Sequence, residues 1–396
     1  MACRSLTGSV LAAALLLVAY SSACTQSNGA PASGGASDAG ETSASDAGNR
    51  GSEASAPHHD GGAAALDAGT DAPSPVDGSS TTDAASADAG SAAATAKAKV
   101  LATLAGFSGA HTAIGVEDKD SSNPTADSDT MTSMAGTGQH PSFWSADWGF
   151  GTGAVNSRES IVQEGKKQWA QGAIVQYIYH ACPPSWGADE SCGWGDVDGS
   201  SISNTDWPDL VTSGGALYKV WIARLDVLAG FFQELKSAGV APLFRVMHEM
   251  NDGWVWWAGH AGQSGSAALY RITHDYLVNV KGLDNIIWVW NLKDIGSLAQ
   301  DVTDFNPGSS YYDVAALDMY IQGYTGGNYA AMQQAAAGKP MGIAECEVLP
   351  DPGTLAAQPL WSYVAMWPDY FNLDTSVIPA LFTDPRVVTL EKMPGW

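Results

Sequence analysis

Two glutamates in this sequence stand where they could do acid–base or nucleophilic chemistry. Glu249 lies in the stretch RVMHEMNDGWVWW (residues 245–257), directly after the apolar run 241–244, together with a histidine and three tryptophans. Glu345 follows a second apolar run, 341–344. Two carboxyl groups that face each other can break a glycosidic bond, because one protonates the leaving oxygen while the other attacks or activates water. The alternative interpretation is that Glu249 is a solvated loop acid and that the tryptophans only fill a core.

A metal site is a second alternative for the dipeptide formed by His248 and Glu249. In the zinc motif that contains this dipeptide, a second histidine follows four residues after the first, with the acid between them. The residue at that position here is Asp252. We therefore predict no metal site and no cofactor.

The elements that position these residues follow an alternating pattern. From about residue 98, short apolar runs alternate with amphipathic stretches, which predicts strands separated by helices. The expected strands are residues 112–116, 141–148, 173–180, 241–245, 286–291, 312–320 and 341–344, and further apolar runs lie at 361–367, 377–382 and 387–390. The expected helices are residues 158–172, 217–239, 270–281 and 329–338. This order predicts an α/β protein with a (β/α)8 TIM barrel. A doubly wound sheet has the same alternation of strands and helices. We disfavour it because no glycine-rich phosphate loop follows the first expected strand.

Polar or aromatic residues end the expected strands one after another. They are Asp147 and Trp148, His180, His248 and Glu249, Asn291, Asp318 and Tyr320, Glu345, and Trp367. In a barrel of parallel strands these positions meet at one mouth. Glu249 and Glu345 would end the fourth and seventh strands, and tryptophan faces at that mouth would stack on the C–H surfaces of sugars. The pattern therefore favours glycoside hydrolysis.

Residues 25–97 differ from the rest of the chain in composition. They are rich in Ala, Gly, Ser, Thr and Asp, they contain no Phe, Trp or Tyr, and the tripeptide DAG recurs at residues 38, 46, 67 and 88. Such a segment buries too little apolar area to offset the entropy lost on ordering. We predict a signal peptide over residues 1–24, a disordered linker over residues 25–97 and a glycoside hydrolase domain over residues 98–396.

Residues 1–24 have the features of a secretory signal. Arg4 precedes an apolar run at residues 10–19, and the small residues 21–23 precede Cys24. We therefore expect export from the cell. Cys24 with a polar linker after it also resembles a bacterial lipoprotein signal, so the mature chain is expected either at the cell surface, anchored through a lipidated Cys24, or secreted after simple cleavage.

The remaining cysteines are interpreted for an oxidising compartment. Cys182 and Cys192 lie ten residues apart in a loop rich in Pro and Gly, and we expect them to form a disulfide. Cys346 is left over. A nucleophilic role is possible for a lone thiol, but no histidine lies near Cys346 in sequence, and we expect a free thiol buried in a strand.

The charge of the chain excludes one class of partner. The formal net charge is −24 at pH 7, whereas binding to nucleic acid phosphates requires a basic face. We therefore expect no nucleic acid partner. An acidic surface suits an uncharged substrate better than a polyanion.

Six sequence blocks support a family resemblance. They are AIVQYIYHACPP (173–184), FRVMHEMNDGWVWW (244–257), NIIWVWN (285–291), YYDVAALDMY (311–320), KPMGIAECEVLPDP (339–352) and DPRVVTLEKMP (384–394). In this order they resemble glycoside hydrolase family 26, a family of β-mannanases, and the resemblance covers roughly residues 103–394. It implies a barrel with the acid on strand four and the nucleophile on strand seven.

The resemblance implies two catalytic and five substrate-binding residues. The catalytic pair is Glu249 as acid/base and Glu345 as nucleophile, which Tyr320 would orient. The substrate-binding residues are His180, His248, Trp254, Tyr320 and Trp367. Trp361 is close to Trp367 in sequence and is the alternative for that last position.

Two features depart from the family pattern. The family has a glycine two residues after the nucleophile, where this chain has Glu347. Residues two apart on a strand point to the same side, so Glu347 competes with Glu345 for the nucleophile's role. We favour Glu345, because it adjoins the apolar run and Glu347 would reach the rim. The second departure is the loop 182–194, which lies where substrate contacts are expected.

The expected protein is a monomeric, endo-acting, retaining glycoside hydrolase that cleaves β-1,4-mannosidic bonds in a β-linked plant-type polysaccharide such as mannan. The resemblance also allows β-1,3-1,4-glucan or β-1,3-xylan as substrate. A catalytically inactive polysaccharide-binding protein is the alternative from another class. Deleting residues 25–96 is expected to leave turnover of a short soluble substrate unchanged.

Overall fold

The structure is a computed structural model that describes residues 81–187, 190 and 192–396. The predicted signal peptide over residues 1–24, with Cys24, lies outside the described residues, and so does the predicted linker as far as residue 80. None of the helices in the described part of the chain combines the length and the apolar character needed to cross a bilayer.

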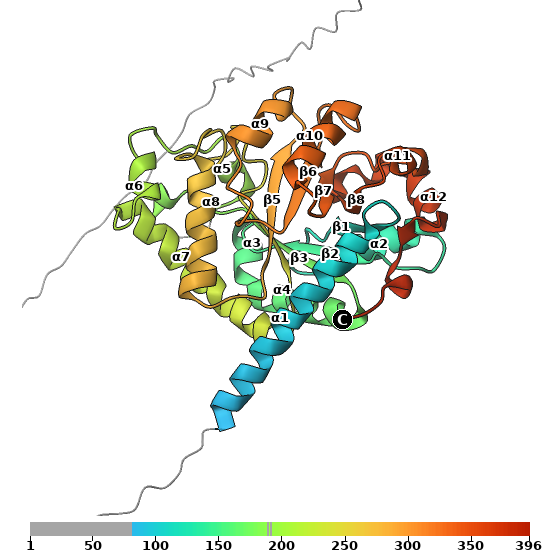
Figure 1. Cartoon of the computed structure of the whole chain (residues 1–396), viewed down its shortest axis with the longest axis horizontal. Helices are drawn as coiled ribbons and strands as arrows, with labels where there is room; N and C mark the ends of the chain where they lie inside the picture. Colours follow the sequence, from blue (N-terminus) through green and yellow to red (C-terminus); the bar gives the residue numbers. More distant parts are fainter. Residues whose placement is uncertain (1–80, 188–189, 191) are drawn as a thin grey trace, which may run out of the picture. The chain divides into compact units, whose positions relative to one another are not determined.

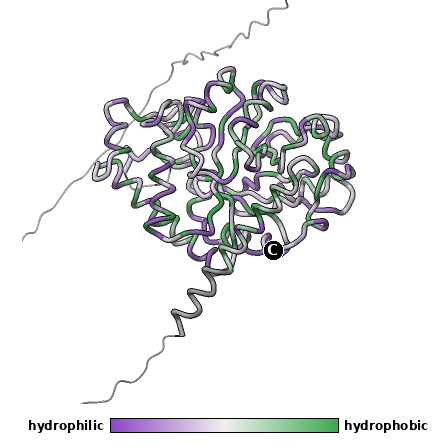
Figure 2. The backbone as a smooth tube through the Cα atoms, in the orientation of Figure 1, coloured by the Kyte–Doolittle hydropathy of each residue, from purple (hydrophilic) through white to green (hydrophobic). Residues whose placement is uncertain are grey.

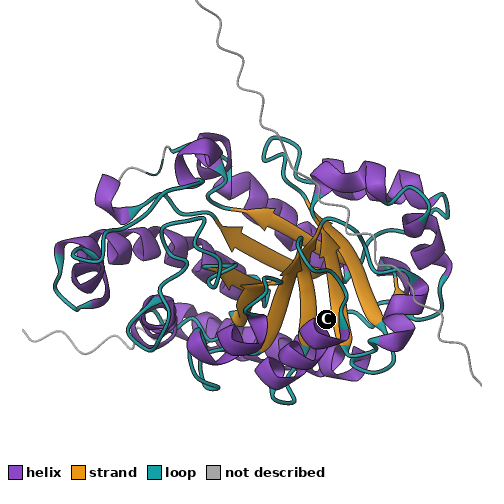
Figure 3. Cartoon of the chain, turned by 90° about the horizontal axis from the view of Figure 1, so that it is seen from above, coloured by secondary structure: helices purple, strands orange, loops and turns teal. Residues whose placement is uncertain are grey.

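Parallel strands close into a barrel, as predicted. Within the described residues the strands are β1 (Thr112–Glu117), β2 (Phe143–Asp147), β3 (Ile174–Tyr179), β4 (Leu243–Val246), β5 (Ile287–Lys293), β6 (Val314–Met319), β7 (Met341–Cys346) and β8 (Trp361–Met366). Each strand pairs in parallel with the next, and β1 closes the barrel by pairing with both β2 and β8. A short strand, β9 (Val387–Val388), adds to β1. Figure 3 shows the strands enclosed by helices.

Helices connect the strands and cover the outside of the barrel (Figure 1). They are α1 (Thr81–Phe107), α2 (Ala126–Ala135), α3 (Gly151–Asn156), α4 (Arg158–Gln171), α5 (Trp194–Val197), α6 (Trp207–Val211), α7 (Ala216–Ser237), α8 (Ser266–Asp275), α9 (Leu298–Asp304), α10 (Gly326–Ala336), α11 (Pro352–Ala357) and α12 (Val377–Thr383). A π-helical turn, η2 (Tyr276–Val280), extends α8, and 3-10 turns occur at η1 (Pro184–Trp186), η3 (Pro368–Leu373) and η4 (Leu390–Lys392). The four predicted helices correspond to α4, α7, α8 with η2, and α10.

The alternation of side chains explains why these segments fold as they do. Figure 2 shows hydrophobic and hydrophilic residues alternating along the outer helices, as expected for helices with one buried face. Every strand from β1 to β8 is buried along nearly its whole length, which accounts for the nearly continuous apolar runs in the sequence.

The barrel interior changes from apolar at its base to charged at its mouth. Near the strand starts, Phe143, Ile174 and Leu243 belong to one buried apolar cluster. Near the strand ends, the buried side chains include Arg245 and Asp318. The buried charges named here therefore lie at the C-terminal ends of the strands, which is where the active sites of TIM barrels are formed.

Helix α1 corrects the predicted boundary of the linker. Composition predicts that residues 81–97 belong to the disordered segment, but they are helical, and the prediction is wrong for them. Ala93 and Ala96 are buried, and Ala96 belongs to the apolar cluster at the barrel base. The physical reason is that alanine has the highest helix propensity and packs closely without any large side chain, so the absence of aromatic residues does not exclude packing.

This packing changes the expected result of truncation. Removing residues 25–80 should leave the melting temperature unchanged, because all of α1 remains. Removing residues 25–96 should lower it by several degrees, since it deletes the buried Ala93 and Ala96, and each kcal/mol lost corresponds to about 2–4 °C in a domain of this size. Calorimetry on the two truncated proteins measures the difference. Equal melting temperatures would mean that the N-terminal half of α1 does not stabilise the barrel.

Candidate active site

A cleft of about 680 Å³ opens at the C-terminal ends of the strands. Its lining residues are Lys119, Phe150, His180, Trp194, Asp198, His248, Glu249, Trp254, Lys293, Tyr320, Ile321, Glu345, Glu347, Trp367, Asp369 and Tyr370. All seven residues that the sequence analysis selected are among them, although they come from segments far apart in the chain. Trp361, the alternative to Trp367, is fully buried instead and donates a hydrogen bond to Gln358.

Glu249 is placed by an unusual backbone conformation directly after β4. Met247 has a φ of 51° and Glu249 a φ of 50°, in the left-handed region that residues other than glycine seldom adopt. The backbone N–H of Glu249 donates to Oδ1 of Asn291 at 2.7 Å, which fixes this turn against β5. Strained residues of this kind persist only where the surroundings hold them. Here the turn points a buried carboxyl group into the cleft.

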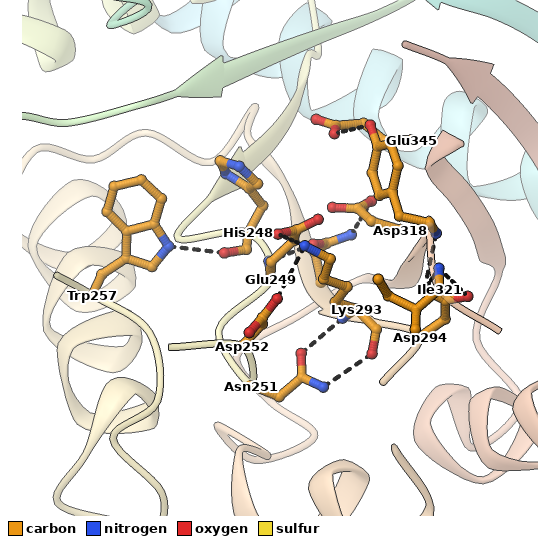
Figure 4. Close-up of polar contacts among 12 residues, drawn as sticks. His248, Glu249, Asn251, Asp252, Trp257, Lys293, Asp294, Asp318, Ile321 and Glu345 are labelled. Carbon is orange, nitrogen blue, oxygen red and sulfur yellow. Dashed lines mark hydrogen bonds and ion pairs between the residues drawn. The ribbon is translucent and has the colours of Figure 1, made fainter. Parts of the chain in front are cut away.

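Charge and burial oppose each other at Glu249. Its side chain contacts the Lys293 ammonium, with Nζ 3.1 Å from Oε2, and the same ammonium lies 3.0 Å from Asp252 (Figure 4). Burial raises the pKa of Glu249 to about 7, although the positive charge of Lys293 acts to lower it. A carboxyl group that keeps a proton near neutral pH is suited to act as a general acid.

Glu345 is also buried and paired with a cation, but donors occupy both of its oxygens. Arg245 on β4 forms an ion pair with Oε1 of Glu345 and a second one with Asp318 at 2.7 Å. The Tyr320 hydroxyl donates to Oε2 of Glu345 at 2.8 Å. Both carboxylate oxygens therefore have fixed donors that stabilise negative charge. This is the environment of a positioned nucleophile rather than of an acid.

The two carboxyl groups stand close together. Glu249, Asp318 and Glu345 each offer one oxygen within 4.8 Å of the others. Asp318 is fully buried and is held by Arg245 and by Nδ2 of Asn291 at 2.8 Å. Because Asp318 does not line the cleft, the pair that can reach a substrate is Glu249 and Glu345. Because one oxygen of each lies within 4.8 Å of an oxygen of the other, the pair fits the roughly 5–5.5 Å found in retaining glycosidases better than the roughly 6.5–9.5 Å at which inverting enzymes leave room for a water.

Two histidines lie beside Glu249. Nδ1 of His180 is bound to the carboxylate of Asp147, and the His180 and His248 rings pack nearly perpendicular with their centroids 4.3 Å apart. Burial, together with the charge of His180, holds the pKa of His248 well below its usual range. The Trp257 indole donates to the carbonyl oxygen of His248 at 2.8 Å. His248 is therefore a neutral side chain that can hydrogen-bond an uncharged ligand.

Aromatic rings form a continuous wall along one side of the cleft. The distance between ring centroids is 5.1 Å for Trp254 and Trp194, and 5.0 Å for Trp194 and Phe150, which are stacked. The centroids of Phe150 and Trp367 are 5.7 Å apart. Trp254 and Trp367, the two ends of this row, were predicted from the sequence, whereas Trp194 and Phe150 between them were not. Trp194 belongs to the loop 182–194, so the departure of that loop from the family pattern was the available signal.

Two cations of the site, Arg245 on β4 and Lys293 at the end of β5, were not predicted from the sequence. For Arg245 the available signal is a basic residue inside an otherwise apolar strand, because such a charge is rarely buried without a partner. Lys293 lies two residues beyond the predicted strand 286–291 and gives no such signal.

Glu347 is half-buried and also lines the cleft, beyond the end of β7. Unlike Glu345, its carboxylate has no hydrogen bond or ion pair among the contacts of the described residues. This location at the rim agrees with the interpretation that Glu345 is the inner carboxylate of the two.

The predicted disulfide between Cys182 and Cys192 is present, and Cys346 is free and buried, so both expectations are confirmed. The loop that the disulfide closes is further held by Arg224, which donates to the carbonyl oxygen of Gly187 at 2.6 Å. The disulfide therefore anchors the chain just before Trp194.

Comparison with known proteins agrees with this geometry. The chain matches the model of Glycosyl hydrolase family 26 over residues 90–392. The chain belongs to this family. A mannan endo-1,4-beta-mannosidase of Thermothelomyces thermophilus is 30% identical over 254 residues, which are 61% of this chain and 50% of the relative. The Bacillus subtilis (strain 168) enzyme of the same name is 29% identical over 222 residues, 53% of this chain and 58% of the relative, so the chain spans only about half the length of these relatives.

Solved structures of the family superpose on most of the chain. GH26A from Muricauda sp. MAR_2010_75 is 29% identical with a TM-score of 0.68, covering 74% of this chain and 95% of that one. The beta-mannanase from a symbiotic protist of the termite Reticulitermes speratus, solved with a gluco-manno-oligosaccharide, is 25% identical with a TM-score of 0.65, covering 76% and 95%. The predicted family 26 membership and the TIM barrel are therefore confirmed.

The disulfide loop of this family 26 member supports a prediction about binding. Replacing both Cys182 and Cys192 with Ser, or Trp194 with Ala, should raise KM for a polymeric substrate by about tenfold, the effect of losing roughly 1.4 kcal/mol of aromatic contact. The matched control is Trp186→Ala, because Trp186 is 50% exposed in the same loop but does not line the cleft. Steady-state kinetics check this result. An equal rise in KM for Trp186→Ala would show that loop stability, not the Trp194 indole, was altered.

Proposed function

We propose that this protein is a retaining endo-β-1,4-mannanase in which Glu249 is the acid/base and Glu345 is the nucleophile. One observation supports the proposal most strongly: oxygens of Glu249 and Glu345 lie within 4.8 Å of each other, burial raises the pKa of Glu249 to about 7, and both oxygens of Glu345 accept from Arg245 and Tyr320. The two relatives described above are both named as mannan endo-1,4-beta-mannosidases.

The reaction would proceed in two displacements. In the first, an oxygen of Glu345 bonds to the anomeric carbon while Glu249 transfers its proton to the leaving sugar oxygen, so the glycosidic bond breaks and a glycosyl ester forms. In the second, Glu249, now ionised, removes a proton from water, which attacks the anomeric carbon and releases Glu345. The Arg245 and Tyr320 contacts hold the nucleophile in line and favour its departure as a carboxylate.

The substrate class follows from the walls of the cleft. Trp194, Trp254 and Trp367 offer ring faces to a neutral sugar, and His248 is uncharged. Such a cleft suits a neutral β-linked polysaccharide better than an anionic one, because two of its lysines are already paired with carboxylates. Mannan is favoured by the relatives, while β-1,3-1,4-glucan and β-1,3-xylan remain alternatives.

A substrate panel tests the proposal. Purified protein should release reducing ends from mannan faster than from mixed-linkage glucan or β-1,3-xylan. A rapid fall in viscosity relative to reducing ends would indicate internal cleavage, and NMR of the first product should show the β anomer. Hydrolysis confined to another glycan would replace the substrate assignment. Binding to mannan without hydrolysis would favour the inactive binding protein.

The location of the protein is a separate part of the proposal. We propose that the chain is exported, either anchored through a lipidated Cys24 or released as a monomer, on the basis of the signal-like residues 1–24. Comparing membrane and culture fractions for the natural sequence and Cys24→Ser distinguishes the two fates. Equal release of both proteins would exclude the lipid anchor.

A further inference from the structure

A buried carboxylate outside the cleft holds the segment that presents Tyr320. Asp294 follows β5 directly and is fully buried. Its two oxygens accept hydrogen bonds from the backbone N–H groups of four consecutive residues, 320–323. The distances are 2.9 Å from Tyr320, 2.8 and 3.1 Å from Ile321, 2.6 Å from Gln322 and 2.7 Å from Gly323. Figure 4 shows Asp294 beside Ile321 and next to Lys293.

The segment 320–323 lies between β6 and α10, and no strand of the described chain pairs with it. Buried N–H groups without an acceptor are costly, so the carboxylate supplies what the sheet does not. Successive N–H groups that converge on one anion form a strong, geometrically defined site, and each bond to a charged acceptor is stronger than a neutral one. Asp294 therefore determines where this loop stands relative to the barrel.

The position of this loop matters because of its first residue. The Tyr320 hydroxyl donates to Oε2 of Glu345 at 2.8 Å, while Lys293, adjacent to Asp294 in sequence, contacts Glu249 at 3.1 Å. Asp294 is thus connected through Tyr320 to Glu345 and through Lys293 to Glu249, the two proposed catalytic carboxyl groups. It touches neither of them, and it does not line the cleft.

We infer that Asp294 is a positioning residue, which acts on the reaction by holding Tyr320 against Glu345. This inference rests on the proposed function, in which Glu345 is the nucleophile. A displacement of about 1 Å in a positioning group can lower a rate about 100-fold. The loss should fall mainly on kcat, because the indole rings of Trp194, Trp254 and Trp367 lie in other segments of the cleft lining.

Two measurements on Asp294→Asn test the inference. The amide nitrogen of asparagine faces N–H donors and cannot accept from them, so the amide protons of residues 320–323 should exchange at least about tenfold faster in hydrogen–deuterium exchange. In kinetics, kcat should fall about 10- to 100-fold with little change in KM. The matched control is Asp209→Asn, since Asp209, in α6, also accepts two backbone N–H groups, from Ala216 and Leu217 at the start of α7, but does not line the cleft.

A double-mutant cycle separates positioning from simple destabilisation. If Asp294 acts through Tyr320, then Asp294→Asn should change kcat by less than about threefold in a Tyr320→Phe background, because the contact it maintains is already absent. Full additivity of the two substitutions would overturn the inference, and so would unchanged amide exchange or unchanged kcat in Asp294→Asn. Failure of the proposed function would give another result. The natural sequence would then show no turnover on any glycan, while the amide protons of residues 320–323 would still exchange faster in Asp294→Asn.

Discussion

Glu345→Ala should lower kcat on the order of 10⁴-fold or more, because it removes the group that forms the covalent bond to the sugar. Added azide should restore part of the rate. The small anion can occupy the space left by the carboxylate, beside Arg245 and Tyr320, and attack the anomeric carbon from the same face. The product should be a glycosyl azide with the anomeric configuration opposite to that of the substrate. Product NMR at several azide concentrations measures both the rescue and the configuration.

Glu347→Gln is the matched control for this experiment. Glu347 lies two residues further along and lines the same cleft, but no cation is paired with it among the described residues. Its replacement should cost far less activity and should need no azide. If Glu347→Gln were the inactive, azide-rescued variant and Glu345→Ala remained active, the assignment of the nucleophile would be wrong.

Glu249→Ala should lower kcat/KM on a natural glycan about 10²- to 10⁴-fold, the usual contribution of a general acid. The same variant should retain much more activity in the first step on an aryl glycoside, whose leaving group needs no proton. A comparison of sugar and aryl leaving groups checks this difference. An equal loss on both substrates would show that Glu249 has a different role.

The pH dependence gives a second test of the same residue. Glu249 must be protonated to act as an acid, and its pKa is raised to about 7 by burial. Activity of the natural sequence should therefore fall as the pH rises through about 7, and Glu249→Ala should lose this alkaline limb.

The positive charge of Lys293 acts to lower the pKa of Glu249, so Lys293→Met should move the alkaline limb to higher pH. A shift to lower pH in Lys293→Met would contradict the assignment.

Most of the fold and part of the site could be predicted because their signals are local. Apolar runs of strand length mark the β-strands, and parallel strands bring their C-terminal ends together. Glu249, Glu345 and His180 could therefore be placed at one mouth of the barrel from the sequence. The disulfide between Cys182 and Cys192 could be predicted from their short separation in sequence and from the expected oxidising compartment. The residue at which the linker ends could not be predicted, because composition cannot distinguish an alanine-rich helix packed on a barrel from an alanine-rich disordered segment.

Strand order and the twofold alternation of side chains were enough to place Glu249, Glu345 and the other predicted residues at the mouth of the barrel, but not Trp194 or Lys293. What each residue can do there depends on contacts between distant parts of the chain. The partner of Glu345 is Arg245, 100 residues away in sequence, and that of Glu249 is Lys293, 44 residues away. The acidity of a carboxyl group depends on its burial and on charges within a few ångströms, and these distances exist only once the barrel has closed.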